Sequence, residues 1–325
     1  PRRPDSPRYE PDPYTCLDTF LNFCCEKYPA KHYMLFILGH GVVVGNDVFM
    51  YDEHAEKHSI TLNEMGEALG EFKDKIQEQD ATFELVGFHS CSVSSIEVAY
   101  ELKGTAKYMM ASQGPTFVGS WPYRQILIRI FNELEQNGNK PKIRKLVSDI
   151  FSCCVNNSAD YLLAGYSYQL TLLDLRQVHK LEAAIEKLST AFVDALLPDE
   201  ETQRNDAAST FIILYAHWKA QSFFQEMYTD LYDFCSCITE RCQRIREVNR
   251  ESMTRRLEAV EVACKEVKSV LEKAKDADAK ATRVGQLASQ VAQADAQGRM
   301  RTAQAGQVLL FLLTMLLAGE DSETM

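Results

Sequence analysis

Neither the long hydrophobic run of a membrane-spanning helix nor the basic surplus of a nucleic-acid-binding protein is present in this sequence. The longest apolar run, VLLFLLTMLLAG at residues 308–319, is shorter than the roughly 20 residues that a spanning helix requires. We therefore expect no membrane span and interpret the run as a buried or partner-facing helix. The formal net charge is -11, whereas nucleic-acid binding needs clustered Lys and Arg. The remaining class is an acidic protein whose 325 residues can bury one large core or two modest ones.

The cysteines follow neither the spacing of a small disulfide scaffold nor that of a zinc ribbon. Adjacent cysteines rarely bond to each other, and no second Cys or His pair stands at zinc-ligand spacing from the CSCITERC segment (235–242). The pattern favours reduced, buried thiols in a cytoplasmic protein and predicts no metal. The ten cysteines include two adjacent pairs and one cluster: Cys24-Cys25, Cys153-Cys154, and Cys235, Cys237 and Cys242.

Strand-like and helical patterns alternate from residue 15 to residue 135. Apolar runs of strand length occur at 32–41, 81–88 and 106–112, and such runs suit strands that are covered on both faces of a parallel sheet. Apolar residues at helical spacing predict helices over 15–27, 61–76, 93–102 and 121–134. Thr61 and Glu64 form a capping box at the start of the second helix. This alternation predicts an α/β protein with a mostly parallel sheet flanked by helices.

The second half of the sequence has a more helical pattern. Apolar residues alternate with others over 164–175, which predicts a further strand. Residues 210–217 fit either a strand or part of a helix. Leu257, Val260, Cys264 and Val267 recur at alternating steps of three and four, which is typical of a short coiled coil. We therefore predict a flexible leader over 1–14, a catalytic domain over 15–245 and a helical or coiled-coil-like extension over 246–325.

Two predicted strands end at residues with reactive side chains, His40 and Cys91. The carboxyl ends of strands in an open α/β sheet carry ligands and catalytic groups, so neighbouring strands would bring these residues to one edge. A helix over 93–102 would place Cys91 at its N-terminus, where unpaired N–H groups make a thiolate nucleophilic. His40 lies about fifty residues upstream, the order and spacing of caspase-type cysteine proteases. The N–H groups of Gly41 and Cys91 can then form an oxyanion hole. Taken singly, each residue would more often serve packing than catalysis.

Collinear blocks of the sequence resemble the clostripain-like cysteine peptidases of the caspase-type clan. The blocks are HYMLFILGHG (32–41), ITLNEMGEAL (60–69), GFHSCSVSSIEVAYELKGTAKYMMAS (87–112), GSWPYRQIL (119–127), YQLTLLDLRQVHKLEAAIEKL (168–188) and AQSFFQEMYTDLYDFC (220–235). The resemblance implies a caspase- and gingipain-like fold with a helical C-terminal extension. It also implies that His40 is the catalytic histidine, that Cys91 is the nucleophile, and that Gly41 and Cys91 supply the oxyanion donors. The substrate would be a protein or peptide.

The sequence departs from this family where the substrate side chain is expected to bind. The family usually has Asp two residues before the cysteine, and here that residue is His89. An imidazole cannot pair with Arg or Lys, so we expect a specificity different from the family's preference for basic side chains. Ser112 and Gln113 stand in a segment that is acidic in the family, and Trp121 begins the helix near its cleft. We therefore assign substrate binding to His89, Ser112, Gln113 and Trp121, although Trp121 fits a core role equally well.

Two alternatives stay open at this point. Related enzymes depend on calcium, and Asp47, Asp52 and Glu53 are the acidic residues that follow His40. Surface carboxylates are common, so we expect no cofactor and keep calcium as the alternative. The competing function is a catalytically silent signalling or scaffold protein that binds a protein partner through residues 246–325.

Overall fold

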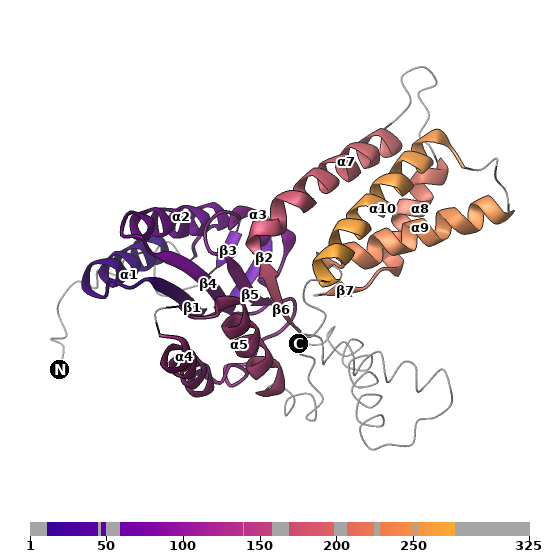
Figure 1. Cartoon of the computed structure of the whole chain (residues 1–325). Helices are drawn as coiled ribbons and strands as arrows, with labels where there is room; N and C mark the ends of the chain where they lie inside the picture. The colour runs from indigo at the N-terminus through magenta and orange to yellow at the C-terminus, as the bar shows by residue number, and fades with distance from the viewer. Residues whose placement is uncertain are drawn as a thin grey trace, which may run out of the picture. The chain divides into compact units, whose positions relative to one another are not determined.

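The structure, a computed structural model, describes residues 12–44, 47–49, 59–138, 140–157, 169–197, 207–223, 228–248, 250 and 253–276. The chain divides into two compact units, of which the first contains the described residues up to Arg176 and the second those from Gln177 to 276. Figure 1 shows an α/β arrangement in the first unit and helices in the second.

A four-stranded sheet forms the centre of the first unit. Its elements in chain order are α1 (Pro13–Lys27), β1 (His32–Leu38), β2 (Gly41–Val44), β3 (Asp47–Phe49), α2 (Leu62–Glu78), β4 (Thr82–His89), α3 (Ile96–Glu101), β5 (Tyr108–Ser112), α4 (Tyr123–Asn137), α5 (Ile143–Asn157) and β6 (Leu170–Asp174). The strand order is β1-β4-β5-β6, with β1, β4 and β5 parallel and β6 antiparallel to β5. Helices α1 and α2 cover one face of the sheet, and α4 and α5 cover the other (Figure 1). This confirms the predicted mostly parallel sheet flanked by helices.

Burial differs between the central strands and the edge strand. Every residue of β5, and every residue of β4 after Thr82, is buried, as the apolar runs predicted. In β1 only Ile37 is buried, and Leu38 is 56% exposed. The expectation that this first run is covered on both faces is therefore wrong, because β1 lies at the edge of the described sheet.

The predicted helices are present, with one important change. The capping box forms as expected, because the Thr61 side chain accepts from the Glu64 N–H and the Glu64 carboxylate accepts from the Thr61 N–H. Helix α3 begins only at Ile96 with Ser95 as its N-cap, so the predicted helix over 93–102 is shorter at both ends. The antiparallel pair β2–β3 was not predicted.

The second unit is a bundle of α7 (Val178–Leu196), α8 (Ala207–Lys219), α9 (Leu231–Val248) and α10 (Arg255–Asp276), with a short pair of strands, β7 (Ser222–Phe223) and β8 (Tyr228–Thr229). A 3-10 turn over Leu175–Gln177 precedes α7. The coiled-coil-like stripe of α10 is buried in one hydrophobic cluster with residues of α7, α8 and α9. The predicted boundary at 245 falls inside α9, and the structure divides the chain after Arg176 instead, because these four helices bury their apolar faces together.

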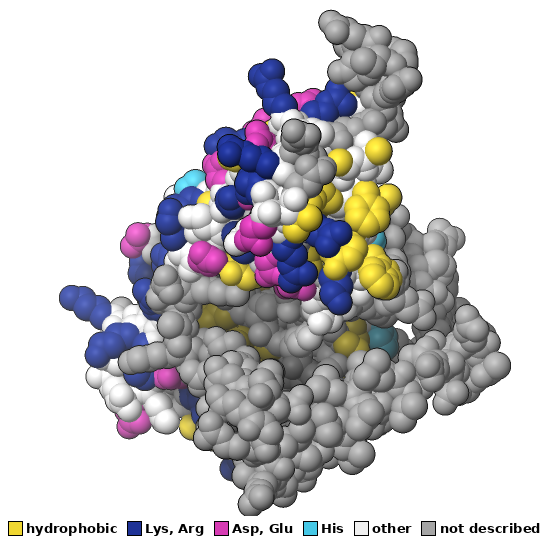
Figure 2. Space-filling view, turned by 90° about the vertical axis from the view of Figure 1, so that its right-hand side faces the viewer, with side chains coloured by type: hydrophobic (Ala, Val, Ile, Leu, Met, Phe, Trp, Pro, Cys, Tyr) yellow, Lys and Arg dark blue, Asp and Glu magenta, His cyan; other side chains and the backbone are white. Residues whose placement is uncertain are grey.

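Helix α8 explains the ambiguous pattern at 210–217. Ile212, Ile213 and Ala216 are buried in the bundle, while Phe211, Leu214 and Trp218 are exposed, so this helix is apolar on two faces and shows little helical periodicity. Figure 2 shows a patch of hydrophobic side chains on one face of the molecule, among Lys, Arg, Asp and Glu side chains. In the part of the chain that the structure describes, no helix has the length and apolar character needed to cross a membrane.

Candidate active site

The sheet register brings the backbone at His40 and Cys91 to the same edge. Strands β1 and β4 are parallel neighbours, and Leu38 pairs with His89 at their carboxyl ends. His40 and Cys91 each stand two residues beyond this pair. The Gly39 N–H also donates to the His89 carbonyl oxygen at 3.4 Å, which links the ends of β1 and β4. His40 is exposed and Cys91 is half-buried.

Gly41 is the point of closest approach between the chain after β1 and the turn that contains Cys91. A Cβ atom on Gly41 would lie 2.5 Å from Ser90 Oγ, 3.0 Å from Val93 Cγ2 and 3.5 Å from the Cys91 carbonyl oxygen. Any larger residue would therefore force the Ser90 and Val93 side chains on either side of Cys91 to shift. By contrast, a Cβ atom on Gly39 would meet nothing within 4 Å.

Cys91 lies in a tight turn, which we call the cysteine turn (residues 90–94). Ser92 has a φ of 52°, in the left-handed region that a residue with a Cβ seldom occupies. Such backbone strain persists only where surrounding contacts hold it. Since α3 starts at Ile96, the helix N-terminus does not contact the thiol, and the predicted source of thiolate stabilisation is absent. The Ser92 and Ser94 N–H groups donate instead to the carbonyl oxygens of Gly114 and Ser112, in the segment that follows β5.

The structure places His89 inside the protein. Its side chain is buried, its ring stacks on Trp121 with centroids 4.9 Å apart, and both ring nitrogens have partners. Nε2 lies 2.8 Å from the Phe117 carbonyl oxygen, which can only accept, and Nδ1 lies 3.0 Å from Tyr123 Oη. These partners assign the proton to Nε2 and leave Nδ1 as the acceptor from the tyrosine hydroxyl. Burial lowers the pKa of His89, although the bond to Phe117 opposes this in part, so the ring is neutral near pH 7.

The other residues expected to bind substrate differ in exposure. Ser112 ends β5 and is buried, with its hydroxyl donating to the carbonyl oxygens of Gly114 (3.0 Å) and Gln169 (2.5 Å). Trp121 is buried in a cluster with residues of α4 and α5, whereas Gln113 is half-buried. The structure thus leaves Gln113 the most accessible of the four, and substrate contact by any of them stays a prediction.

Sequence reasoning missed Thr116. Its main-chain N–H donates to Cys91 Sγ at 3.3 Å, and its carbonyl oxygen lies 3.7 Å from the same sulfur. These are backbone groups 25 positions away from Cys91 in the chain, so no side-chain motif could have identified them.

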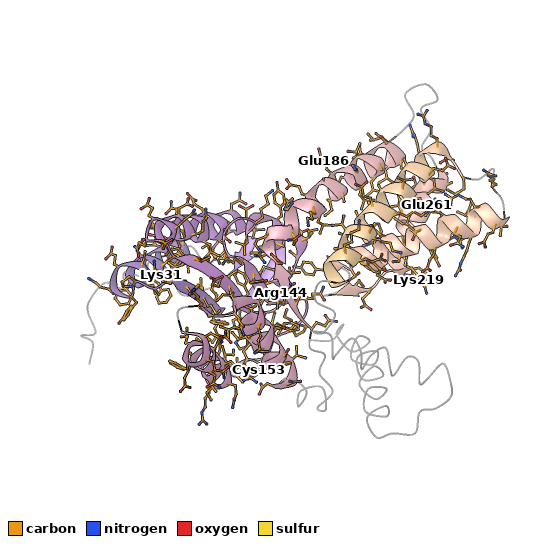
Figure 3. All side chains as sticks on the ribbon, viewed as in Figure 1. Lys31, Arg144, Cys153, Glu186, Lys219 and Glu261 are labelled. Carbon is orange, nitrogen blue, oxygen red and sulfur yellow. The ribbon has the colours of Figure 1, made fainter. Side chains whose placement is uncertain are left out.

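The CSCITERC segment, considered above as a metal site, belongs to the helical core. Cys235 and Cys242 are fully buried beside Cys264 of α10, and burial raises the pKa of Cys242 to about 11. No group of three or more His, Cys, Asp or Glu residues suited to a metal ion occurs within the described ranges. All ten cysteines are described, and none is in a disulfide. Figure 3 marks Cys153, one of the buried thiols, on α5.

The carboxylates considered for calcium lie mostly outside the described residues. Asp52 and Glu53 are not described, and of Asp47 only the backbone at the start of β3 is. Calcium binding there therefore stays a prediction.

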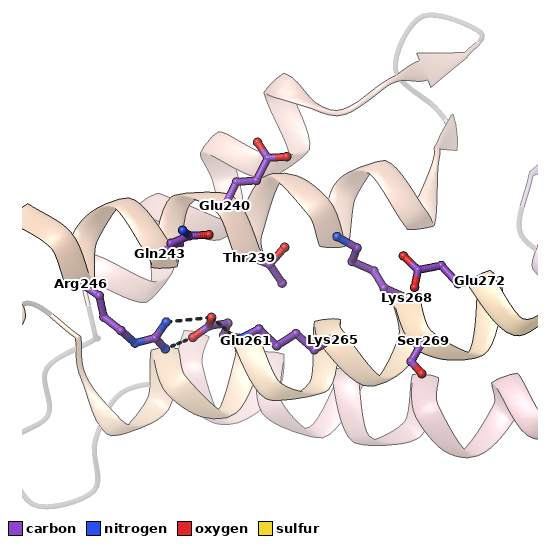
Figure 4. A pocket seen from close by; sticks show the side chains of 9 residues that line it. All are labelled: Thr239, Glu240, Gln243, Arg246, Glu261, Lys265, Lys268, Ser269 and Glu272. Atoms are coloured by element: carbon purple, nitrogen blue, oxygen red, sulfur yellow. Dashed lines mark hydrogen bonds and ion pairs between the residues drawn. The ribbon is translucent and has the colours of Figure 1, made fainter. Parts of the chain in front are cut away.

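A pocket of about 470 Å³ lies in the second unit, between α9 and α10. Three of its charged residues form one ion-pair group: the Glu261 carboxylate accepts a bidentate contact from Arg246 and lies 2.7 Å from Lys265 Nζ (Figure 4). Burial alone would raise the pKa of Glu261, but the hydrogen bonds from Arg246 and Lys265 outweigh it and lower the pKa. We therefore interpret this pocket as part of the contact between α9 and α10, which these ion pairs stabilise.

The first unit is thus an α/β protein whose chain brings a cysteine and a histidine to the carboxyl ends of adjacent parallel strands. Residues 10–291 match the model of the clostripain family, peptidase family C11. The chain belongs to this family.

Individual relatives are distant. Clostripain of Hathewaya histolytica is 23% identical over 257 residues, which are 69% of this chain and 47% of that protein. The chain therefore spans about half the length of this curated relative. Among solved structures, a secreted C11 cysteine protease of Bacteroides thetaiotaomicron, iotapain, has a TM-score of 0.46 at 15% identity, over 74% of this chain and 64% of that one. An inactive zymogen C11 protease of Parabacteroides distasonis has a TM-score of 0.42 at 15% identity, over 77% and 58%.

Proposed function

We propose that this chain is a cysteine endopeptidase that acts through Cys91 and His40. The proposal rests on one observation: the paired strands β1 and β4 end side by side, so that the residues after them, His40 and Cys91, follow at the same edge of the sheet. The close approach of Gly41 to the cysteine turn supports this arrangement. Membership of the clostripain family supports the same reaction.

In the proposed reaction, His40 takes the proton from the Cys91 thiol, and the thiolate attacks the carbonyl carbon of the scissile bond. A C–S bond forms, and the negative charge on the oxygen is stabilised by the N–H groups of Gly41 and Cys91. The imidazolium of His40 then protonates the leaving amine as the C–N bond breaks. Water, deprotonated by His40, cleaves the thioester and restores the thiol.

We also propose that the specificity is not for Arg or Lys. His89 is a neutral ring with both nitrogens bonded inside the protein, and the segment from Ser112 to Trp121 contains no acidic residue. A cationic substrate side chain would find no carboxylate to pair with there. A polar or uncharged side chain is the better match.

Cleavage of a mixed peptide library tests both parts of this proposal. Mass spectrometry of the products should show cuts by the wild-type chain that disappear in Cys91→Ala and His40→Ala. Cys16→Ala, which changes an exposed cysteine on α1, is the matched control and should cleave normally. The residues before the cuts should not be enriched in Arg or Lys, and an enrichment would reject the specificity.

The silent-scaffold alternative makes a different prediction. A peptide acyloxymethyl ketone should alkylate Cys91 in an active peptidase and leave it unmodified in a scaffold. A folded chain that neither cleaves peptides nor reacts at Cys91, with and without calcium, would reject the proposed function.

A further inference from the structure

The segment after β5 runs back along the cysteine turn and is bonded to it at successive positions. We call residues 113–120 the covering loop. The Ser94 N–H donates to the Ser112 carbonyl oxygen at the end of β5 (2.9 Å), the Ser92 N–H donates to the Gly114 carbonyl oxygen (3.1 Å), and the Thr116 hydroxyl donates to the Ser90 carbonyl oxygen (3.2 Å). This ladder supports the left-handed backbone at Ser92 and fixes where Cys91 points.

The ladder places Thr116 directly against the sulfur. The Thr116 N–H is 3.3 Å from Cys91 Sγ, and the Thr116 carbonyl oxygen is 3.7 Å away and can accept the S–H of the neutral thiol. The two backbone groups of Thr116 thus contact the sulfur together and restrict where it can lie. The first turn of α3 lies further along the chain, because α3 starts five residues after Cys91.

His89 holds the other side of the covering loop. Its Nε2–H donates to the Phe117 carbonyl oxygen at 2.8 Å, next to Thr116, and its ring is fixed by stacking on Trp121 and by the Tyr123 hydroxyl. Because His89 is the last residue of β4, this bond anchors the loop to the centre of the sheet. The pKa of His89 is lowered by burial, which keeps the ring neutral, so that Nδ1 can accept from the Tyr123 hydroxyl while Nε2–H donates to Phe117.

We propose that Thr116 and His89 are positioning residues for the nucleophile: the Thr116 N–H holds the Cys91 sulfur in place, and His89 holds the loop that carries Thr116. The proposal rests on the assignment of Cys91 as the nucleophile. It gives His89 an internal role in place of the substrate contact expected from the sequence.

The direct test is Thr116→Pro, which removes the N–H contact to the sulfur and also the hydroxyl bond to Ser90. Thr116→Val removes only the hydroxyl and separates the two effects. The matched control is Val118→Pro, which puts a proline in the same loop at the second position of the turn closed by the Ser120 N–H and the Phe117 carbonyl oxygen (2.9 Å), a position where proline is favoured. The readout is the rate of Cys91 alkylation by iodoacetamide from pH 5 to 9, by peptide mass spectrometry. The exposed Cys16 in the same molecule serves as the internal reference.

We expect Thr116→Pro to slow Cys91 alkylation about tenfold at pH 7, the effect of losing one donor that holds the sulfur in place, and Thr116→Val to slow it much less. Val118→Pro and Cys16 should keep wild-type rates. A wild-type profile in folded Thr116→Pro would overturn the proposal, as would an equal loss in Val118→Pro.

A second pair of variants keeps the test decisive where Thr116→Pro does not fold. His89→Phe retains an aromatic ring but loses the bond to Phe117, whereas Tyr123→Phe loses only the hydroxyl on the opposite nitrogen. The proposal requires slower Cys91 alkylation in His89→Phe than in Tyr123→Phe, and equal rates would reject it. Alkylation needs no peptide substrate, so a chain that shows this pattern but cleaves nothing would reject the proposed function while leaving the positioning roles intact.

Discussion

The polar residues at the two ends of strand β4 differ in charge and in the partners that they bind. At its start, Glu84 is fully buried, with its carboxylate 2.6 Å from His32 Nδ1 and 2.9 Å from Lys107 Nζ. At its end, His89 is a neutral ring bonded to neutral groups beside the cysteine turn. A buried charge needs partners to persist, whereas a site that binds a ligand needs access and alignment. We therefore expect substitutions at the start of β4 to change the free energy of unfolding, and substitutions at its end to change the reactivity of Cys91.

The strand pairing itself accommodates Glu84. The register between β1 and β4 shifts between Tyr33 and Met34, which pair with Phe83 and Leu85, so that Glu84 is an extra residue in β4. A bulge of this kind turns one side chain away from the regular alternation. Here it directs the carboxylate to His32 and Lys107 on either side.

The largest effect on stability should come from Glu84→Gln. Removing the charge leaves Lys107 without its partner next to a buried amide, and we expect a loss of about 2 kcal/mol in the free energy of unfolding. Urea denaturation followed by circular dichroism measures this loss. Asp80→Asn is the control, because it breaks the exposed ion pair with Lys31 and keeps a residue type that tolerates the φ of 57°; it should not change the midpoint. A normal midpoint in Glu84→Gln would contradict the comparison.

Among substitutions that keep Cys91 and His40, the largest effect on activity should come from Gly41→Ala. The added methyl group would lie 2.5 Å from Ser90 Oγ and 3.0 Å from Val93 Cγ2, so these side chains, on both sides of Cys91, must shift. Small misplacements of catalytic groups are costly, and we expect Cys91-dependent peptide cleavage to fall about tenfold or more.

Gly39→Ala separates this alignment effect from a general loss of backbone freedom. A methyl group there meets nothing within 4 Å, and this variant flanks His40 on the other side. Cleavage should be near normal, with thermal melting of both variants close to wild type. Equal losses in the two glycine variants would show that the close approach at Gly41 does not matter.

A smaller effect concerns the pH dependence of stability. The pKa of His89 is lowered in the folded state. In the unfolded chain, by contrast, the ring takes up a proton near the ordinary histidine pKa of about 6.5. This contribution to stability is fully present above about pH 6.5 and is lost as pH falls through the lowered value in the folded protein. His89→Phe should lose less stability than wild type between pH 7.5 and 5, as measured by urea denaturation. Parallel curves would contradict the neutral, buried ring.

The smallest effect is expected from Ser95→Ala. Its hydroxyl caps α3 by accepting from the Val98 N–H at 3.4 Å, and loss of such a cap costs about 0.5–1 kcal/mol. Cys91 alkylation should not change, because the short helix does not contact the thiol. A slower alkylation rate would restore the helix N-terminus as a source of thiolate stabilisation.

Local patterns were enough to predict much of the first unit. The capping box at Thr61 and the buried runs of β4 and β5 are set by neighbours in the chain. The edge position of β1 and the helical state of residues 210–217 were not predictable in this way, because an apolar run is compatible with several environments. For the site, chain order and strand ends singled out His40, Gly41 and Cys91. Their contacts depend on which strands become neighbours.

The family, the alternation of strands and helices, and the residue types at the strand ends could all be inferred from the sequence. The tertiary structure was needed to show that His89 is buried and bonded on both nitrogens and that α3 begins beyond the cysteine turn. It was also needed to show that the Thr116 N–H contacts the sulfur. The physical reason is that backbone donors and acceptors are identical at every position, so which of them meets a given side chain depends on strand pairing and loop path.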